Sequence, residues 1–134
     1  MELSAVIFFS IIGMSLLGGC NKTEAQNVRQ ARYRSISPID AKKMMSESAD
    51  FIILDVRTED EHKEIRIAGS VLLPVSEIKN RAEKEIPDKT KLIFVHCKSG
   101  RRSASAAKEL VSLGYINVYD IGGISQWPYE TVSN

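Results

Sequence analysis

The chain has 134 residues, of which 43% are hydrophobic and 26% are charged, and these values are ordinary for a globular protein. Setting aside an apolar N-terminal segment leaves about 115 residues, enough for one hydrophobic core and too few for a second domain. The net charge of +1 is small and spread along the chain, which argues against a nucleic-acid partner. The two cysteines, Cys20 and Cys97, lie in unrelated contexts and indicate neither a disulfide framework nor a metal cluster.

Residues 1–19 are predicted to be a cleaved leader. The segment from Leu3 to Cys20 has no charged residue, and its apolar run closes on two glycines before Cys20, a small-residue ending of the kind that signal peptidases accept. This ending resembles the lipobox of bacterial lipoproteins, which implies that Cys20 is lipidated and becomes the first residue of the mature chain. Asn21 lacks the aspartate associated with inner-membrane retention, so the resemblance implies a domain on the periplasmic face, attached to the outer membrane where one exists.

The alternative is an uncleaved N-terminal membrane anchor. A secretory leader usually begins with Lys or Arg, whereas the only early charge here is Glu2. Basic residues follow the apolar segment, and they would leave the domain of an uncleaved anchor in the cytoplasm. We expect the lipoprotein, because cysteine after Leu-Gly-Gly is specific and 18 residues are marginal for crossing a bilayer.

Residues 20–33 are polar and have no apolar periodicity, so they are predicted to be the lipidated cysteine and a flexible tether, and residues 34–134 the folded domain. Ser37 and Pro38 provide an N-cap and a first helical position. The helix is expected to continue to about Ser48 on an apolar stripe made of Ile39, Ala41, Met44 and Met45.

A buried strand and shorter elements follow this helix. Phe51–Val56 is a β-prone run without polar alternation until Asp55, as expected of a strand covered on both faces. Thr58 and Glu61 have the spacing of a capping box that opens a short helix. Ile67–Leu72 is predicted to be one short strand, and Ser76–Glu85 a helix that ends before a proline.

The remaining elements again alternate between strand and helix. Lys91–His96 is another buried strand, Ser103–Leu113 is a helix closed by Gly114, and Asn117–Ile121 is a final strand. Strands that alternate with helices over about one hundred residues indicate an α/β domain with a mainly parallel sheet.

The loop after Lys91–His96 combines one cysteine with three cationic residues. Ligands collect at the carboxyl ends of strands in such sheets, and Cys97 lies at one of these ends. Gly100 permits backbone N–H groups to curl around the sulfur, and the following helix dipole adds positive potential. The thiol should therefore ionise below its free pKa of about 8.5. We predict Cys97 as a nucleophile within a binding loop made of Lys98, Ser99, Gly100, Arg101, Arg102 and Ser103. A structural, buried cysteine before an ordinary helix is the alternative, and the surrounding charges argue against it.

Four motifs occur in the domain: Asp55-Val56-Arg57 followed by Glu61, Ile67–Ser70 with Pro74, Cys97–Ser103, and Gly122-Gly123 with Trp127. In this order and spacing they resemble those of single-domain rhodaneses, over about residues 35–130. There are two departures, because this chain has Ile65-Arg66 where the family usually has Gly-His, and His62 where it has an aromatic residue.

The resemblance implies a rhodanese-like three-layer fold and a thiosulfate sulfurtransferase activity without cofactor or metal. Cys97 would take the outer sulfur of thiosulfate or a persulfide donor, hold it as a persulfide, and pass it to a thiol or to cyanide. Lys98, Arg101 and Arg102 would attract the anionic donor. We expect a monomer that binds no nucleic acid and reaches the membrane only through the lipid on Cys20.

Two other functions stay open. Phosphatases on this fold separate cysteine and arginine by five residues, but the sixth residue after Cys97 is Ser103, so a phosphatase is disfavoured. An arsenate reductase is disfavoured as well, because the domain has no second cysteine. A binding or sensing module that stores a persulfide without turnover would keep the same cysteine.

Residues near the loop receive structural interpretations. Asp55, Arg57 and Glu61 are predicted to form an ion pair and a helix cap and not to act as an acid or base. His96 is expected to pack or support the site, because adjacent strand residues point to opposite faces. Trp127 is expected to lie in the core.

Overall fold

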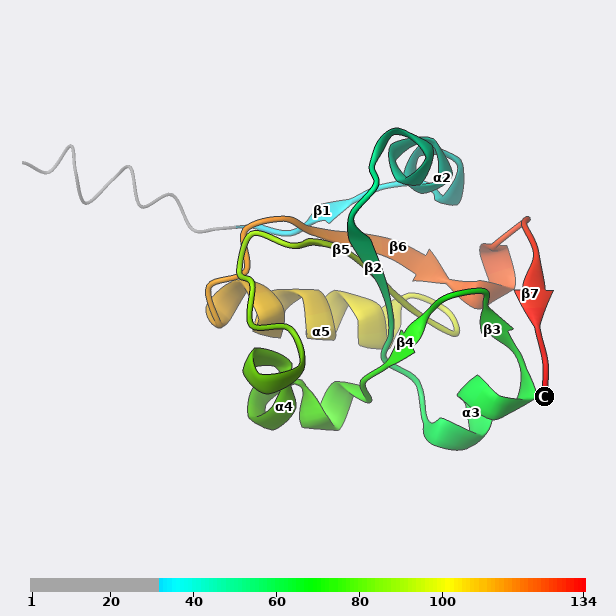
Figure 1. The fold of residues 1–134 in the computed structure, drawn as a ribbon. Helices are drawn as coiled ribbons and strands as arrows, with labels where there is room; N and C mark the ends of the chain where they lie inside the picture. Colours follow the sequence, from blue (N-terminus) through cyan, green and yellow to red (C-terminus); the bar gives the residue numbers. More distant parts are fainter. Residues whose placement is uncertain (1–31) are drawn as a thin grey trace, which may run out of the picture.

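Five parallel strands form the central sheet (Figure 1). The computed structural model describes residues 32–134, so the predictions for the leader, the tether up to residue 31 and Cys20 lie outside the described residues. Every neighbouring pair in the sheet is parallel. The strand order is β1 (Arg34–Ser35), β6 (Val118–Gly123), β5 (Leu92–Cys97), β2 (Phe51–Asp55) and β4 (Val71–Leu72).

Helices cover both faces of the sheet, which confirms the predicted α/β fold. Figure 1 shows α2 (Pro38–Glu47) on one face, and α4 (Ile78–Glu85) and α5 (Arg101–Ser112) on the other. A short helix, α3 (Glu59–Glu64), follows β2. Two further strands, β3 (Arg66–Ile67) and β7 (Thr131–Val132), form a small antiparallel sheet. The single turns η1 (Val75–Glu77) and η2 (Ile124–Gln126) complete the described elements.

Successive residues of the inner strands pack on opposite faces, as the pleat of a strand requires. Ile53 and Phe94 join a core cluster with Met45 of α2. Val95 and Cys97 join the other cluster, together with Leu110 of α5. The sequence alternation therefore places Cys97 on the face covered by α4 and α5.

Two sequence predictions are wrong in detail. Ile67–Leu72 is not one strand, because Gly69 adopts a left-handed backbone (φ 77°) and the residues on its two sides pair in different sheets. Ile39 does not belong to the buried stripe of α2, since it is 67% exposed and Ala41 and Met45 make the buried contact. Within residues 32–134, no helix combines the length and the apolar character needed to cross a bilayer.

Candidate active site

The predicted loop joins the end of β5 directly to the start of α5. Cys97 is the last residue of β5, and α5 begins at Arg101, two residues earlier than expected. Gly100 is the N-cap of α5 and has a left-handed backbone (φ 102°), which glycine adopts at little cost. Its N–H donates to Cys97 Sγ at 3.0 Å. The sulfur therefore lies inside the loop at a helix N-terminus, where partial positive charge favours an anion.

Cys97 is buried, with 1% of its surface exposed. Burial is also what a structural cysteine would show, but here the Gly100 N–H points at the sulfur, an arrangement that favours the thiolate. The side chain exposes almost no surface, so neighbouring groups shield the sulfur from solvent in this conformation.

The pKa of the Cys97 thiol lies below its ordinary value. Burial raises this pKa, but hydrogen bonds from the Ser103 hydroxyl and from the N–H groups of Ser103, Gly100 and Ser99 outweigh it. The Ser103 hydroxyl has only one proton, and its shortest contact is 2.7 Å to Asp120 Oδ1. We therefore attribute the stabilisation of the thiolate mainly to the backbone N–H groups and less to the Ser103 hydroxyl.

Strand β6 and the turn η2 that follows it support the loop at its two ends. Asp120 accepts from the Ser103 hydroxyl at the start of α5. At the other end, the carbonyl of Lys98 accepts from the N–H and the hydroxyl of Ser125. A Cβ on Gly123 would lie 2.0 Å from that same carbonyl oxygen, so only glycine allows this approach.

Arg102, predicted to belong to the binding loop, forms an ion pair with a carboxylate of α3. Its guanidinium donates to both oxygens of Glu61 at 2.8 Å, in a bidentate pair. Glu61 also accepts from the N–H of Thr58, which completes the predicted capping box of α3. The Arg102 hydrogen bonds, the largest favourable influence, hold the pKa of Glu61 at about 2. Lys98 and Arg101 are exposed and form no ion pair within residues 32–134, so they are the loop cations left for an anion.

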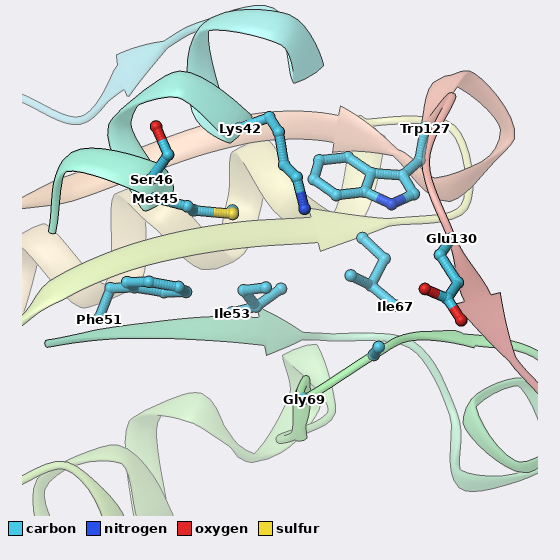
Figure 2. Close-up of a pocket in the computed structure, with 10 residues that line it drawn as sticks. Lys42, Met45, Ser46, Phe51, Ile53, Ile67, Gly69, Trp127 and Glu130 are labelled. Carbon is cyan, nitrogen blue, oxygen red and sulfur yellow. The ribbon is translucent and has the colours of Figure 1, made fainter. Parts of the chain in front are cut away.

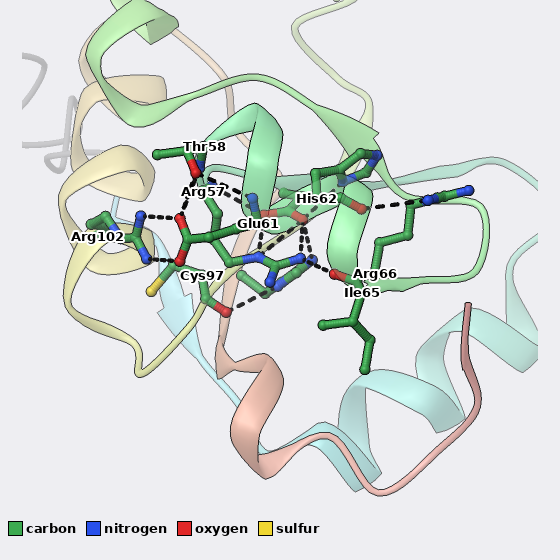
Figure 3. Close-up of polar contacts among 10 residues, drawn as sticks. Arg57, Thr58, Glu61, His62, Ile65, Arg66, Cys97 and Arg102 are labelled. Atoms are coloured by element: carbon green, nitrogen blue, oxygen red, sulfur yellow. Dashed lines mark hydrogen bonds and ion pairs between the residues drawn. The ribbon is translucent and has the colours of Figure 1, made fainter. Parts of the chain in front are cut away.

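Asp55 is the centre of a buried polar cluster, and Figure 3 shows two of its partners, Arg57 and His62. Asp55 is fully buried and accepts from the guanidinium of Arg57 at 2.7 and 2.9 Å. Its Oδ2 also lies 2.9 Å from Nδ1 of His62. Burial raises the pKa of Asp55, but Arg57, His96 and His62 together keep this pKa below its ordinary value. Asp55, Arg57 and Glu61 lie within ion-pair and capping networks next to the loop, and the partnership with His62 had no signal in the sequence.

His96 points away from the sulfur, as strand alternation requires. Its Nδ1 lies 3.2 Å from the carbonyl oxygen of Cys97, and its Nε2 lies 3.8 Å from Asp55 Oδ2 without a hydrogen bond among the described residues. Burial, the largest influence, lowers the pKa of His96. His96 therefore supports the backbone that leads into the loop and does not reach the thiol as a base.

Two cavities lie near the C-terminal segment. One of about 390 Å³ borders the loop at Lys98. The other, of about 490 Å³, lies between α2 and the small antiparallel sheet and includes Lys42 and Glu130 but no residue of the loop (Figure 2). Trp127 lines both, so it is a partly buried wall and not the fully enclosed core residue that the sequence suggested.

Comparisons with known proteins agree with this geometry. Residues 37–129 match the model of the rhodanese-like domain family. The thiosulfate sulfurtransferase GlpE of Coxiella burnetii is 35% identical over 96 residues, which cover 71% of this chain and 87% of the relative. The thiosulfate sulfurtransferase PspE of Escherichia coli is 32% identical over 71 residues, which cover 53% and 68%.

Solved structures show the same architecture. A rhodanese-related protein from Thermoplasma volcanium superposes with a TM-score of 0.65 at 34% identity, covering 76% of this chain and all of the other. A rhodanese from E. coli, solved with anions, gives a TM-score of 0.59 at 29% identity, covering 62% of this chain and 98% of the other.

Glu61→Gln is expected to make the Cys97 thiol more acidic. Removing the carboxylate leaves the positive charge of Arg102 uncompensated beside the loop, and this charge favours the thiolate. The alkylation rate of Cys97 at a pH below the thiol pKa should rise by about two- to fivefold. The full pH profile of iodoacetamide alkylation measures this change. Glu59→Gln is the matched control, because Glu59 lies on the same helix and pairs only with Lys63; an equal effect in both variants would contradict the assignment.

Gly123→Ala is expected to displace the loop. The new Cβ would meet the backbone carbonyl of Lys98 and not a flexible side chain, so the loop itself must move. The hydrogen bonds to Sγ should weaken, and the pKa of Cys97 should rise towards its ordinary value. The alkylation pH profile tests this in a variant that circular dichroism shows to be folded. An unchanged profile would show that contact with β6 does not hold the loop.

Proposed function

Because this chain belongs to the rhodanese-like family, we propose that it is a sulfurtransferase that moves a sulfane sulfur from thiosulfate or a persulfide donor through Cys97. The observation that carries the proposal is the hydrogen bond from the Gly100 N–H to Cys97 Sγ within a loop at a helix N-terminus. Such a loop stabilises a thiolate and equally a persulfide anion, because both carry negative charge on sulfur.

The reaction has two halves. The Cys97 thiolate attacks the outer sulfur of thiosulfate, a new S–S bond forms, and sulfite leaves with the electron pair of the bond that breaks. An acceptor thiolate or cyanide then attacks the outer sulfur of the persulfide and releases Cys97 as the thiolate. Lys98 and Arg101 attract the anionic donor, while Arg102 stays paired with Glu61.

The tight loop supports sulfur transfer over phosphate chemistry. A phosphatase on this fold would need an arginine at the position of Ser103, which is buried and bonded to Asp120. The remaining alternative is a persulfide carrier without turnover. Steady-state thiosulfate:cyanide turnover distinguishes the two, because a carrier would load sulfur once and release little thiocyanate.

Incubation with thiosulfate should add the mass of one sulfur atom to the chain. Cys97→Ser should remove this addition completely, because the serine hydroxyl does not ionise near neutral pH and cannot form the persulfide. Intact-mass spectrometry measures both proteins, and cyanide should reverse the addition in the wild type. A wild-type chain that never gains sulfur from thiosulfate or an organic persulfide would end the proposal.

We also propose that the chain is a lipoprotein anchored through Cys20, with residues 20–33 as the tether. Cys20→Ala should then release the domain from the membrane fraction or leave an unprocessed precursor, and globomycin should cause the same precursor to accumulate in the wild type. Fractionation and immunoblotting measure the outcome. A Cys20→Ala domain that remains membrane-bound and protected on the cytoplasmic side would favour the uncleaved anchor.

A further inference from the structure

The 390 Å³ cleft shares a wall with the sulfur loop. Lys98 contributes the loop side, and Glu64 and Ile65 contribute the end of α3. The C-terminal segment adds Trp127 and Tyr129, whose rings pack edge to face with centroids 5.1 Å apart. Lys98 directly follows Cys97 in the chain, so the cleft begins beside the proposed reaction centre, although Cys97 itself does not line it.

The cleft is larger and more apolar than the binding of an inorganic sulfur anion requires. Cavities of about 300–1,000 Å³ accommodate organic ligands of drug size, whereas thiosulfate is a compact anion without apolar surface. Ile65, a large aliphatic residue that is 41% exposed in total, is among the residues that line this cleft. Together with the two aromatic rings it offers apolar contact to a molecule with a carbon body.

Two opposite charges on the cleft have no partner. Lys98 and Glu64 are both exposed, and within residues 32–134 neither side chain forms a hydrogen bond or an ion pair. The other charged groups of the cleft already form ion pairs, Arg57 with Asp55 and Glu61 with Arg102. An occupant with one carboxylate and one ammonium group would complement the two free charges.

We propose that this cleft binds the sulfur acceptor, and that the acceptor is a peptide-sized thiol with a free carboxylate held by Lys98 and a free ammonium group held by Glu64. The inference rests on the proposed sulfurtransferase function, because it concerns the second half of that reaction. The acceptor thiolate forms a bond to the outer sulfur of the Cys97 persulfide, the persulfide S–S bond breaks, and Cys97 keeps its electron pair as the thiolate.

The test is a single-turnover transfer from a preloaded persulfide. The full-length chain is loaded with thiosulfate, freed of excess donor, and checked for one added sulfur atom by intact mass. Loss of that atom is then timed with three acceptors: the dipeptide cysteinyl-leucine, its N-acetyl derivative and its C-terminal amide. Preloading separates acceptor recognition from donor binding, in which Lys98 also takes part.

Glu64→Gln should slow transfer to cysteinyl-leucine by about two- to fivefold and leave transfer to the N-acetyl derivative unchanged. Lys98→Gln should slow transfer to the free acid and not to the amide. Glu47→Gln is the matched control, because Glu47 is an exposed carboxylate on α2, outside the cleft. Equal effects of Glu64→Gln on all three acceptors, or no effect, would overturn the inference while leaving the sulfurtransferase function intact. A wild-type chain that never loads sulfur would overturn both.

Discussion

The geometry of the site depends on one backbone contact, the hydrogen bond from the Gly100 N–H to Cys97 Sγ. It forms because Gly100 adopts a left-handed conformation and turns the chain from the end of β5 straight into α5. A residue with a Cβ would be strained at this φ even though space is available around it. The same turn brings the helix N-terminus to the sulfur, so burial and anion stabilisation occur at one atom. The cost of burying a thiolate is offset locally, which explains how a cysteine with 1% exposure keeps a lowered pKa.

Some charged residues around the loop form ion pairs that hold the structure together, and others form no ion pair and can bind an anion. Glu61 joins the N-cap of α3 to Arg102 of α5, which lies 41 positions after Glu61 in the chain, and so attaches a surface helix to the loop. Asp55 gathers Arg57 and His62 beneath the same region. Of the three cations in the loop, only Lys98 and Arg101 form no ion pair within residues 32–134. A loop that looks strongly basic in sequence is thus more nearly balanced in space, because one of its three cations is paired with a carboxylate.

Local patterns in the sequence predicted much of the fold and the position of Cys97 between the end of a strand and the start of a helix. The apolar runs of β2 and β5, the capping box at Thr58 and the glycine after α5 each encode their element within a few residues. The errors concern long-range partners. Nothing near Arg102 indicates Glu61, nothing near Ser103 indicates Asp120, and no local signal indicates that the residues flanking Gly69 belong to different sheets. Periodicity reports which face a residue occupies but not which distant residue it meets there.

The register between β5 and β6 has a consequence for transferring this chemistry to another protein. Val95 pairs with Asp120 and Cys97 with Gly123, so β6 has one residue more than β5 over this stretch, a bulge that includes Gly122 with its φ of 82°. On either side of this irregularity, Asp120 accepts from Ser103 at the start of α5, and Gly123 lies against the carbonyl of Lys98. Grafting the residues from Cys97 to Ser103 onto a regular parallel sheet would therefore transfer the side chains of the loop but not its conformation. A functional graft must also include β6 with its bulge.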